Sequence, residues 1–159
     1  KTHIFADNQS LNLFNDKVLV EYKKYDGTLI DKKEFDVSIG GDKVFNEVLA
    51  WSNFEYDTYL VAKYNEDGEN KSTIYSPNLF AHSKFEHDFT YEVNKVDDNK
   101  IVIKITANSF IKSLFIHFKD NYKYTYSDNY LNLEKGETKT IFVDSDCKID
   151  ISKIEFEAL

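Results

Sequence analysis

The feature that most constrains this fold is a period-two alternation of apolar and polar residues, which recurs in short runs along the whole chain. Residues 17–24 read KVLVEYKK and residues 100–107 read KIVIKITA, with an apolar residue at every second position. Successive side chains of a β-strand point to opposite faces, so such runs predict strands with one face in a core. No amphipathic helix or heptad repeat interrupts them. The sequence therefore predicts an all-β protein with about a dozen antiparallel strands.

Turn residues and changes of phase indicate where these strands end. Asp26-Gly27 separates two β-rich runs within residues 17–39 and predicts a hairpin. Residues 43–51 (KVFNEVLAW) are compatible with a short helix or a strand, and we predict a strand. Residues 85–93 alternate as a strand in which His87 shares the apolar face. The alternation loses its phase after Ile151, which predicts a bulge or break near Ser152.

The spacing of the strands favours two domains rather than one large barrel. Hairpin-rich stretches of about 80 residues, a size at which a single core is marginal, lie on either side of residue 82. The only proline, Pro77, is followed by a stretch of mixed polarity at residues 78–84. Proline is poorly tolerated in a central strand, so this stretch is the predicted linker. We expect two antiparallel β-sandwiches, at residues 1–82 and 83–159.

The charge and composition exclude several classes of partner. The net charge is −8, and lysine is the only strong base because arginine is absent. Such a surface repels nucleic-acid backbones and anionic lipid, so we expect no nucleic-acid partner and no membrane partner. No apolar run has the ~20 residues needed to cross a bilayer. Methionine is absent, even at position 1, and we expect the chain to begin within a longer polypeptide.

No set of residues predicts catalysis, a metal site or a cofactor. The carboxylates fall at turns or on outward strand positions, where solvation explains them. The acidic turns at residues 65–70, 97–99 and 144–146 lack a calcium-loop pattern. His117 is expected on the solvent-exposed face of a strand. Cys147 is interpreted as a small strand residue rather than a reactive thiol. Our prediction is no catalytic residue, no metal ligand and no cofactor.

Four aromatic residues are the candidates for binding a carbohydrate. They are Trp51 and the alternating set Tyr122, Tyr124 and Tyr126. Exposed aromatic rings can stack on the apolar faces of sugars. Aromatic-rich strands are also ordinary in the cores of β-sandwiches. Packing in a core or an interface is therefore the favoured explanation of these four residues, and sugar binding is the alternative.

A pointed corner in the second half of the chain is the most specific motif. Residues 126–143 read YSDNYLNLEKGETKTIFV, in which Ser127, Asp128, Asn129 and Tyr130 form the corner and Gly136 the next turn. Asp and Asn accept backbone hydrogen bonds in turns and tolerate left-handed backbone, and glycine supplies a permissive dihedral angle. We therefore predict a structural corner and not an active site.

This corner resembles the C-terminal immunoglobulin-like region of β-mannosidases in glycoside hydrolase family two. In that family an SDN-aromatic corner precedes an apolar pair, a PGE turn and a β-branched strand, and Lys135 stands here in place of the proline. Residues 3–8, 17–30 and 58–80 are similar, in the same order, to the sandwich that precedes this region in the family. The resemblance implies two tandem immunoglobulin-like antiparallel β-sandwiches, with the corner in the C-terminal one.

The resemblance also implies where the chemistry of the parent protein lies. The family hydrolyses terminal β-linked mannose with retention, using two glutamates on a (β/α)8 barrel N-terminal to these sandwiches. Such a barrel takes about 250 residues, so these 159 residues cannot include it. The expectation is a non-enzymatic accessory part of a glycosidase whose partner is the upstream catalytic barrel, with an oligosaccharide as candidate ligand. The alternative is an independent carbohydrate- or protein-binding immunoglobulin-like module of a surface protein.

Overall fold

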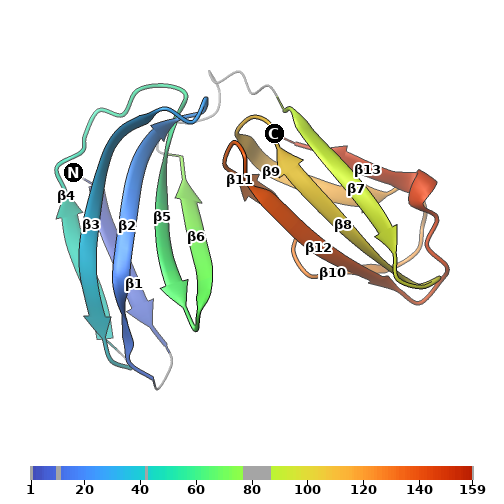
Figure 1. The fold of residues 1–159 in the computed structure, drawn as a ribbon, viewed down its shortest axis with the longest axis horizontal. Helices are drawn as coiled ribbons and strands as arrows, with labels where there is room; N and C mark the ends of the chain where they lie inside the picture. The colour runs from blue at the N-terminus through green and yellow to red at the C-terminus, as the bar shows by residue number, and fades with distance from the viewer. Residues whose placement is uncertain (1, 10–11, 42, 77–86, 159) are drawn as a thin grey trace. The chain divides into compact units, whose positions relative to one another are not determined.

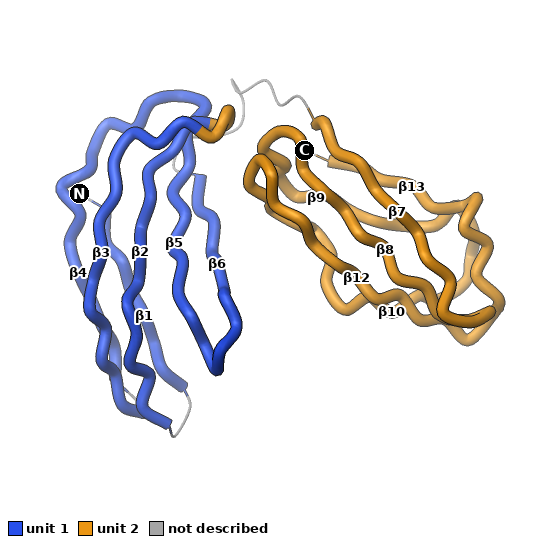
Figure 2. Tube along the Cα trace, in the orientation of Figure 1, with its two compact units in different colours: residues 1–24, 28–83 blue, residues 25–27, 84–159 orange. Residues whose placement is uncertain are grey.

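A computed structural model describes residues 2–9, 12–41, 43–76 and 87–158 of the chain (Figure 1). Within these ranges every regular element but one is a β-strand, and all the described strand pairs are antiparallel. The chain divides into two compact units, coloured separately in Figure 2: unit 1 holds residues 1–24 and 28–83, and unit 2 holds residues 25–27 and 84–159. The all-β prediction is confirmed.

Unit 1 has a four-stranded sheet and a two-stranded sheet. Its strands are β1 (Thr2–Asn8), β2 (Phe14–Lys24), β3 (Leu29–Ile39), β4 (Lys43–Leu49), β5 (Thr58–Glu66) and β6 (Glu69–Tyr75). The larger sheet has the order β3-β2-β5-β6, and β1 pairs with β4 in the smaller one. The predicted hairpin at Asp26-Gly27 joins β2 to β3, and residues 43–49 form the predicted strand.

The core of unit 1 lies between the two sheets. Val18 and Val20 of β2 and Val37 of β3 are buried together with Leu49 of β4. The alternation in the sequence places these residues on one face of each strand, as expected. Ile4 and Ala6 of β1 pack against the same core but are only half-buried. The smaller sheet therefore covers the larger one incompletely.

Unit 2 is a sandwich of four strands on three. It contains β7 (Phe89–Lys95), β8 (Lys100–Ala107), β9 (Ile111–Phe118), β10 (Tyr124–Tyr126), β11 (Leu131–Leu133), β12 (Thr138–Ser145) and β13 (Ile154–Glu157). One sheet has the order β10-β12-β8-β7 and the other β11-β9-β13. Ile103 of β8, Ile116 of β9 and Ile141 of β12 are completely buried between them. After β8 a short connection carries the chain from the four-stranded sheet to β9 in the three-stranded sheet.

The break predicted near Ser152 is a 3-10 turn, η2 (Ile151–Lys153), directly before β13. Asp150 caps this turn, because its Oδ1 accepts hydrogen bonds from the backbone N–H of Ser152 at 3.0 Å and from its hydroxyl at 2.7 Å. The turn reverses the phase, so Ile149 is buried while Ile151 is 48% exposed. The prediction of a break is confirmed.

Two local expectations were wrong. The strand expected from residue 85 begins at Phe89, because the carbonyl of Asp88 accepts hydrogen bonds from Asn108 and Ser109 instead of joining a ladder. His87 therefore precedes the strand. Cys147 is no strand residue: it lies exposed in the bend after β12, where its N–H donates to Ser145 Oγ at 3.2 Å. Pro77, the predicted linker at residues 78–84 and the predicted boundary between residues 82 and 83 lie outside the described residues.

Candidate functional site

The corner begins with Ser127, which extends the pairing of β10 with β12. Its N–H donates to the carbonyl of Phe142 at 2.9 Å, and its Oγ accepts the N–H of Phe142 at 3.0 Å. The Ser127 hydroxyl thus accepts the hydrogen bond that a backbone carbonyl would accept in a regular ladder, at the point where the strand bends away. Next to it, the carboxylate of Asp128 accepts the N–H of Asn129 at 2.9 Å and lies 3.2 Å from Lys139 Nζ.

Asn129 ties the corner to the opposite sheet. Its side-chain Oδ1 accepts the N–H of Ile116 at 2.8 Å, and its Nδ2 donates to the carbonyl of Ile116 at 2.9 Å. The same Oδ1 accepts the N–H of Tyr130 at 2.9 Å. Three backbone groups are satisfied by one amide side chain, which is a structural task.

Tyr130 carries the left-handed backbone of the corner, with φ of 56°. The sequence had suggested that Asp128 or Asn129 would take this conformation, but among the described non-glycine residues neither has positive φ. Tyr130 is turned outward by this backbone, and its side chain is 64% exposed. Leu131 and Leu133 both return to the core, so the three residues divide into one exposed and two buried.

The outward turn of Tyr130 builds a row of rings on the outer face of the three-stranded sheet. Tyr130 stacks on Phe115 with ring centroids 4.7 Å apart, and Phe115 stacks on His117 at 5.2 Å. His117 Nε2 lies 3.3 Å from Glu157 Oε1 and 3.8 Å from Glu155 Oε2. Sequence reasoning missed this row, although Phe115 and His117 alternate with buried residues and so could have been placed on one outer face.

Gly136 lies in the turn that carries the chain from β11 in one sheet to β12 in the other, with φ of 85°. Its N–H donates to the carbonyl of Ala107 at 2.8 Å, and the N–H of Glu137 donates to the carbonyl of Glu134 at 3.0 Å. The side chain of Glu137 accepts the N–H of Glu134 at 2.9 Å, which supports the turn that lacks the family's proline. The expected permissive dihedral is present at Gly136.

The three tyrosines predicted as a possible ladder do not share an open face. Tyr124 stacks on Phe118 with ring centroids 3.8 Å apart, and its hydroxyl donates to Asp120 at 2.8 Å. Burial, together with Asp120, raises the pKa of Tyr124, and burial raises the pKa of Tyr126 to about 12. Both pack against the core of unit 2, whereas Tyr122 is 57% exposed.

Trp51 packs against the core of unit 1. Its ring centroid lies 5.9 Å from that of Tyr22, and its Nε1 donates to Asp31 Oδ2 at 2.6 Å. This hydrogen bond, with a second from the N–H of Lys32, lowers the pKa of Asp31. An indole held at both its ring face and its N–H has a structural use here. Carbohydrate binding by Trp51 and the tyrosines stays a prediction.

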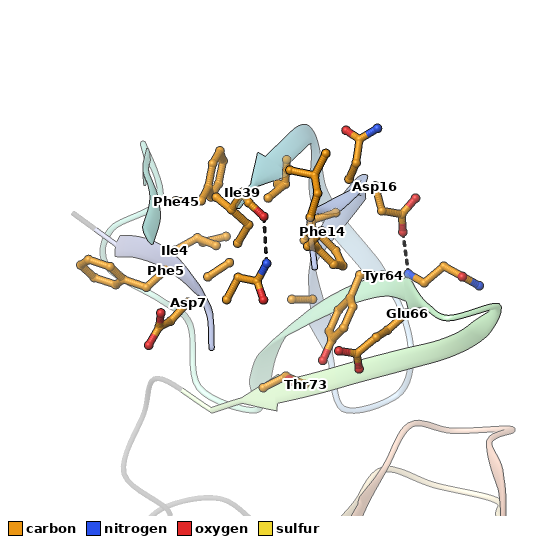
Figure 3. A pocket seen from close by; sticks show the side chains of 18 of the residues that line it. Ile4, Phe5, Asp7, Phe14, Asp16, Ile39, Phe45, Tyr64, Glu66 and Thr73 are labelled. Atoms are coloured by element: carbon orange, nitrogen blue, oxygen red, sulfur yellow. Dashed lines mark hydrogen bonds between the residues drawn. The ribbon is translucent and has the colours of Figure 1, made fainter. Parts of the chain in front are cut away.

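Unit 1 contains a cleft of about 630 Å³ between its two sheets, shown in Figure 3. Its lining includes the apolar residues Ile4, Phe14, Ile39 and Phe45 and several acidic residues. Asn8 also lines the cleft, and its side-chain amide donates to the carbonyl of Ile39 at 2.9 Å. A second cleft, of about 520 Å³, continues along the other part of β1.

Two further observations concern chemistry and membranes. Among the residues that the structure describes, no three His, Cys, Asp or Glu side chains are arranged so that they could hold a metal ion. No helix in this part of the chain is long and apolar enough to cross a membrane.

Comparison with known proteins finds a matching family model and similar solved structures. Residues 84–157 match the family model Ig-mannosidase, an Ig-fold domain. The chain is similar to the crystal structure of a β-D-mannosidase from Dictyoglomus thermophilum, with a TM-score of 0.76 and 16% sequence identity, over 97% of this chain and 20% of that chain. No curated protein matches the chain.

These matches confirm the resemblance that the corner motif indicated. The family model covers almost all of unit 2, including Ser127–Tyr130. The structural likeness extends over both units, and at this identity it establishes a shared fold. The chain spans about a fifth of the length of the solved chain that it matches.

Proposed function

Since residues 84–157 form an Ig-fold domain of the mannosidase type, we propose that the chain is the non-catalytic C-terminal accessory part of a β-mannosidase-like glycoside hydrolase. In this proposal a (β/α)8 barrel of the same polypeptide precedes the two units and carries out the hydrolysis. The two units pack on that barrel and stabilise it.

One observation carries the proposal. The fold likeness to a β-D-mannosidase spans both units in order, while the family model identifies the second unit independently. A single shared immunoglobulin-like sandwich would be weak support, because that fold serves many functions. Two consecutive units within a solved chain five times as long favour an accessory position.

Activity measurements test this proposal directly. Residues 1–159 alone should leave a chromogenic β-mannoside unchanged, whereas the longer polypeptide should hydrolyse it and retain the anomeric configuration. If the longer polypeptide is folded but hydrolyses no β-glycoside in a panel, the proposal is wrong.

The supporting role has its own test. Deletion of residues 1–159 from the longer polypeptide should lower the Tm of the remaining barrel, because the deletion exposes the apolar surface that the units cover. A barrel that melts at the same temperature with and without these residues would contradict a stabilising role, even if hydrolysis is observed.

A second candidate function, an independent binding module, is favoured by the row Tyr130, Phe115 and His117. Stacked rings beside two glutamates offer an apolar face and hydrogen-bond acceptors, which suit a sugar ring. Calorimetry of residues 1–159 with a panel of oligosaccharides tests it. Binding that Tyr130→Ala abolishes and Phe142→Ala leaves intact would support this candidate, since Phe142 is similarly exposed on the other sheet. If calorimetry detects no heat with any oligosaccharide, the hypothesis that the chain is a glycan-binding module is wrong.

A further inference from the structure

The two units share a strand plan, but unit 1 is one strand short. In unit 2, β8 pairs with β12, the chain then crosses to β9, and β9 pairs with β13. In unit 1, β1 pairs with β4, the chain crosses to β2, and β2 pairs with β5. Thus β1 corresponds to β8. The second edge of β8 is paired with β7, whereas no described strand pairs with the second edge of β1, which we call the open edge.

Burial differs between the two equivalent strands as this plan predicts. Ile101, Ile103 and Ile105, the inward residues of β8, are at most 1% exposed. Ile4 and Ala6, the inward residues of β1, are only half-buried. The neighbouring strands on both sides of β8 shield its inward side chains from solvent. β1 has a described neighbour on one side only, so its inward side chains are shielded less.

The sheet opposite the open edge is also uncovered. Ala62 of β5 pairs with Val20 of β2, so it lies on the inner face, and its partner Thr73 on β6 is exposed. Tyr75, on the same inner face, is 59% exposed. The cleft of about 520 Å³ is lined by β1 together with Ala62, Thr73 and Tyr75. The missing cover lies beside β1 and above β5 and β6.

We propose that an extended segment of the same polypeptide, N-terminal to Lys1, pairs antiparallel with the open edge of β1 and completes unit 1 as a sandwich of three strands on four. The plan of unit 2 identifies this occupant, because β7 directly precedes β8 in the chain and its counterpart would directly precede β1. The loop at residues 96–99 joins β7 to β8. By the same geometry the segment is a strand of about seven residues that ends a few residues before Thr2.

The lining of the clefts defines the chemistry of this segment. Alternate residues of the segment are apolar and cover Ala62 and Tyr75. An antiparallel strand would begin beside the end of β1, where Asp7, Glu66 and Asp67 line the wider cleft (Figure 3). A lysine or arginine near the start of the segment would complement these carboxylates.

Hydrogen exchange of the natural longer polypeptide, compared with residues 1–159, tests the pairing. Every second amide of β1 points toward the open edge, and these amides should exchange about tenfold more slowly in the longer polypeptide, because each gains a ladder hydrogen bond. The amides of β8 should exchange equally in both. As a second measurement, a synthetic peptide of the preceding residues, added to residues 1–159, should produce the same protection.

Two substitutions at equally exposed residues separate the loss of the proposed strand contact from the general cost of placing a charged side chain on a strand. Tyr75 on the inner face and Val44 on the outer face of β4 are both 59% exposed. In the longer polypeptide Tyr75→Lys should lower the Tm by about 4 °C or more, and Val44→Lys should change it little. In residues 1–159 the two variants should behave alike.

Several results would overturn the pairing. One is equal hydrogen exchange of the β1 amides in both chains. Another is a natural polypeptide that starts at Lys1. A third is protection of the β1 amides by a concentration-dependent dimer of residues 1–159 or by a different protein. The pairing does not depend on glycosidase activity. A longer polypeptide that protects β1 but hydrolyses no glycoside would contradict only the proposed function, and one that hydrolyses a β-mannoside with an unprotected β1 would contradict only the pairing.

Discussion

The side chain of Asn129 replaces a β-strand partner for Ile116. β11 pairs with β9 through Leu131 and Leu114, and extension of this register by two residues would place Asn129 opposite Ile116. The chain has already turned there, and the amide of Asn129 binds both backbone groups of Ile116, at 2.8 and 2.9 Å. The corner is therefore a device that ends a strand without leaving its neighbour's buried backbone unsatisfied.

Replacement of Asn129 by alanine should destabilise unit 2. Ile116 is completely buried, so the variant leaves one donor and one acceptor without partners. We expect the free energy of unfolding to fall by about 2–3 kcal/mol, measured by urea unfolding. Asn132→Ala is the control, because among the described residues the side chain of Asn132 accepts a single hydrogen bond, from Ser113 N–H at 3.0 Å. Equal losses in the two variants would contradict the role given to Asn129.

The Gly136→Ala variant isolates the backbone strain of the turn between β11 and β12. Nothing lies within 4 Å of a Cβ built on Gly136, so its φ of 85° is the sole reason for a cost. We expect a loss of about 1–2 kcal/mol in thermal or urea unfolding. Gly40 has equal space but no left-handed φ, and Gly40→Ala should be neutral or slightly stabilising. A loss at Gly40 as large as at Gly136 would show that backbone strain is not the cause.

High pH should destabilise unit 2 through Tyr124 and Tyr126. Burial raises the pKa of both hydroxyls in the folded state, that of Tyr126 to about 12 from 10.0. The unfolded chain therefore ionises first, and the stability that the neutral hydroxyls contribute below pH 10 is lost as the pH rises towards 12. Unfolding curves over this range should shift steeply for the natural sequence and less steeply for Tyr126→Phe. Identical slopes would refute the assignment.

Acid should weaken unit 1 through Glu21 on β2. Burial acts to raise the pKa of Glu21, but hydrogen bonds from Lys63 and Lys23, at 2.9 and 3.1 Å, outweigh it and the pKa is lowered. The ionised carboxylate thus contributes stability above pH 4.5 that disappears as the pH falls through the lowered folded pKa. Glu21→Gln should cost about 1 kcal/mol at neutral pH.

The pH dependence of this variant is its check. The difference between Glu21→Gln and the natural chain should vanish in acid, because Glu21 is then protonated in both folded and unfolded states. Lys17→Gln serves as a control, since Lys17 and its partner Glu34 are both more than half exposed. A difference that persists unchanged in acid would point to a packing effect of the substitution.

Local pattern determined much of the fold. Alternation predicted the buried faces of β2 and β8, the Asp26-Gly27 dipeptide predicted the first hairpin, and the loss of phase predicted the break at Ser152. These features depend on neighbours a few residues apart, because the pleat and the turn dihedrals are set locally. The corner motif likewise indicated the mannosidase-type Ig fold of the second unit.

The tertiary structure decided which segments meet. Nothing near residue 129 indicates that its amide would bind Ile116. The aromatic pattern favoured core packing for Tyr122, Tyr124 and Tyr126, but only the tertiary structure separated Tyr124 and Tyr126, which pack against a core, from the exposed Tyr122. The open edge of β1 is visible only once β4 is known to be its described partner. The physical reason is that strand pairing uses backbone groups, which every residue carries alike. The sequence by itself therefore specifies strands and their faces, whereas the order of strands and the completeness of each sheet follow from long-range packing.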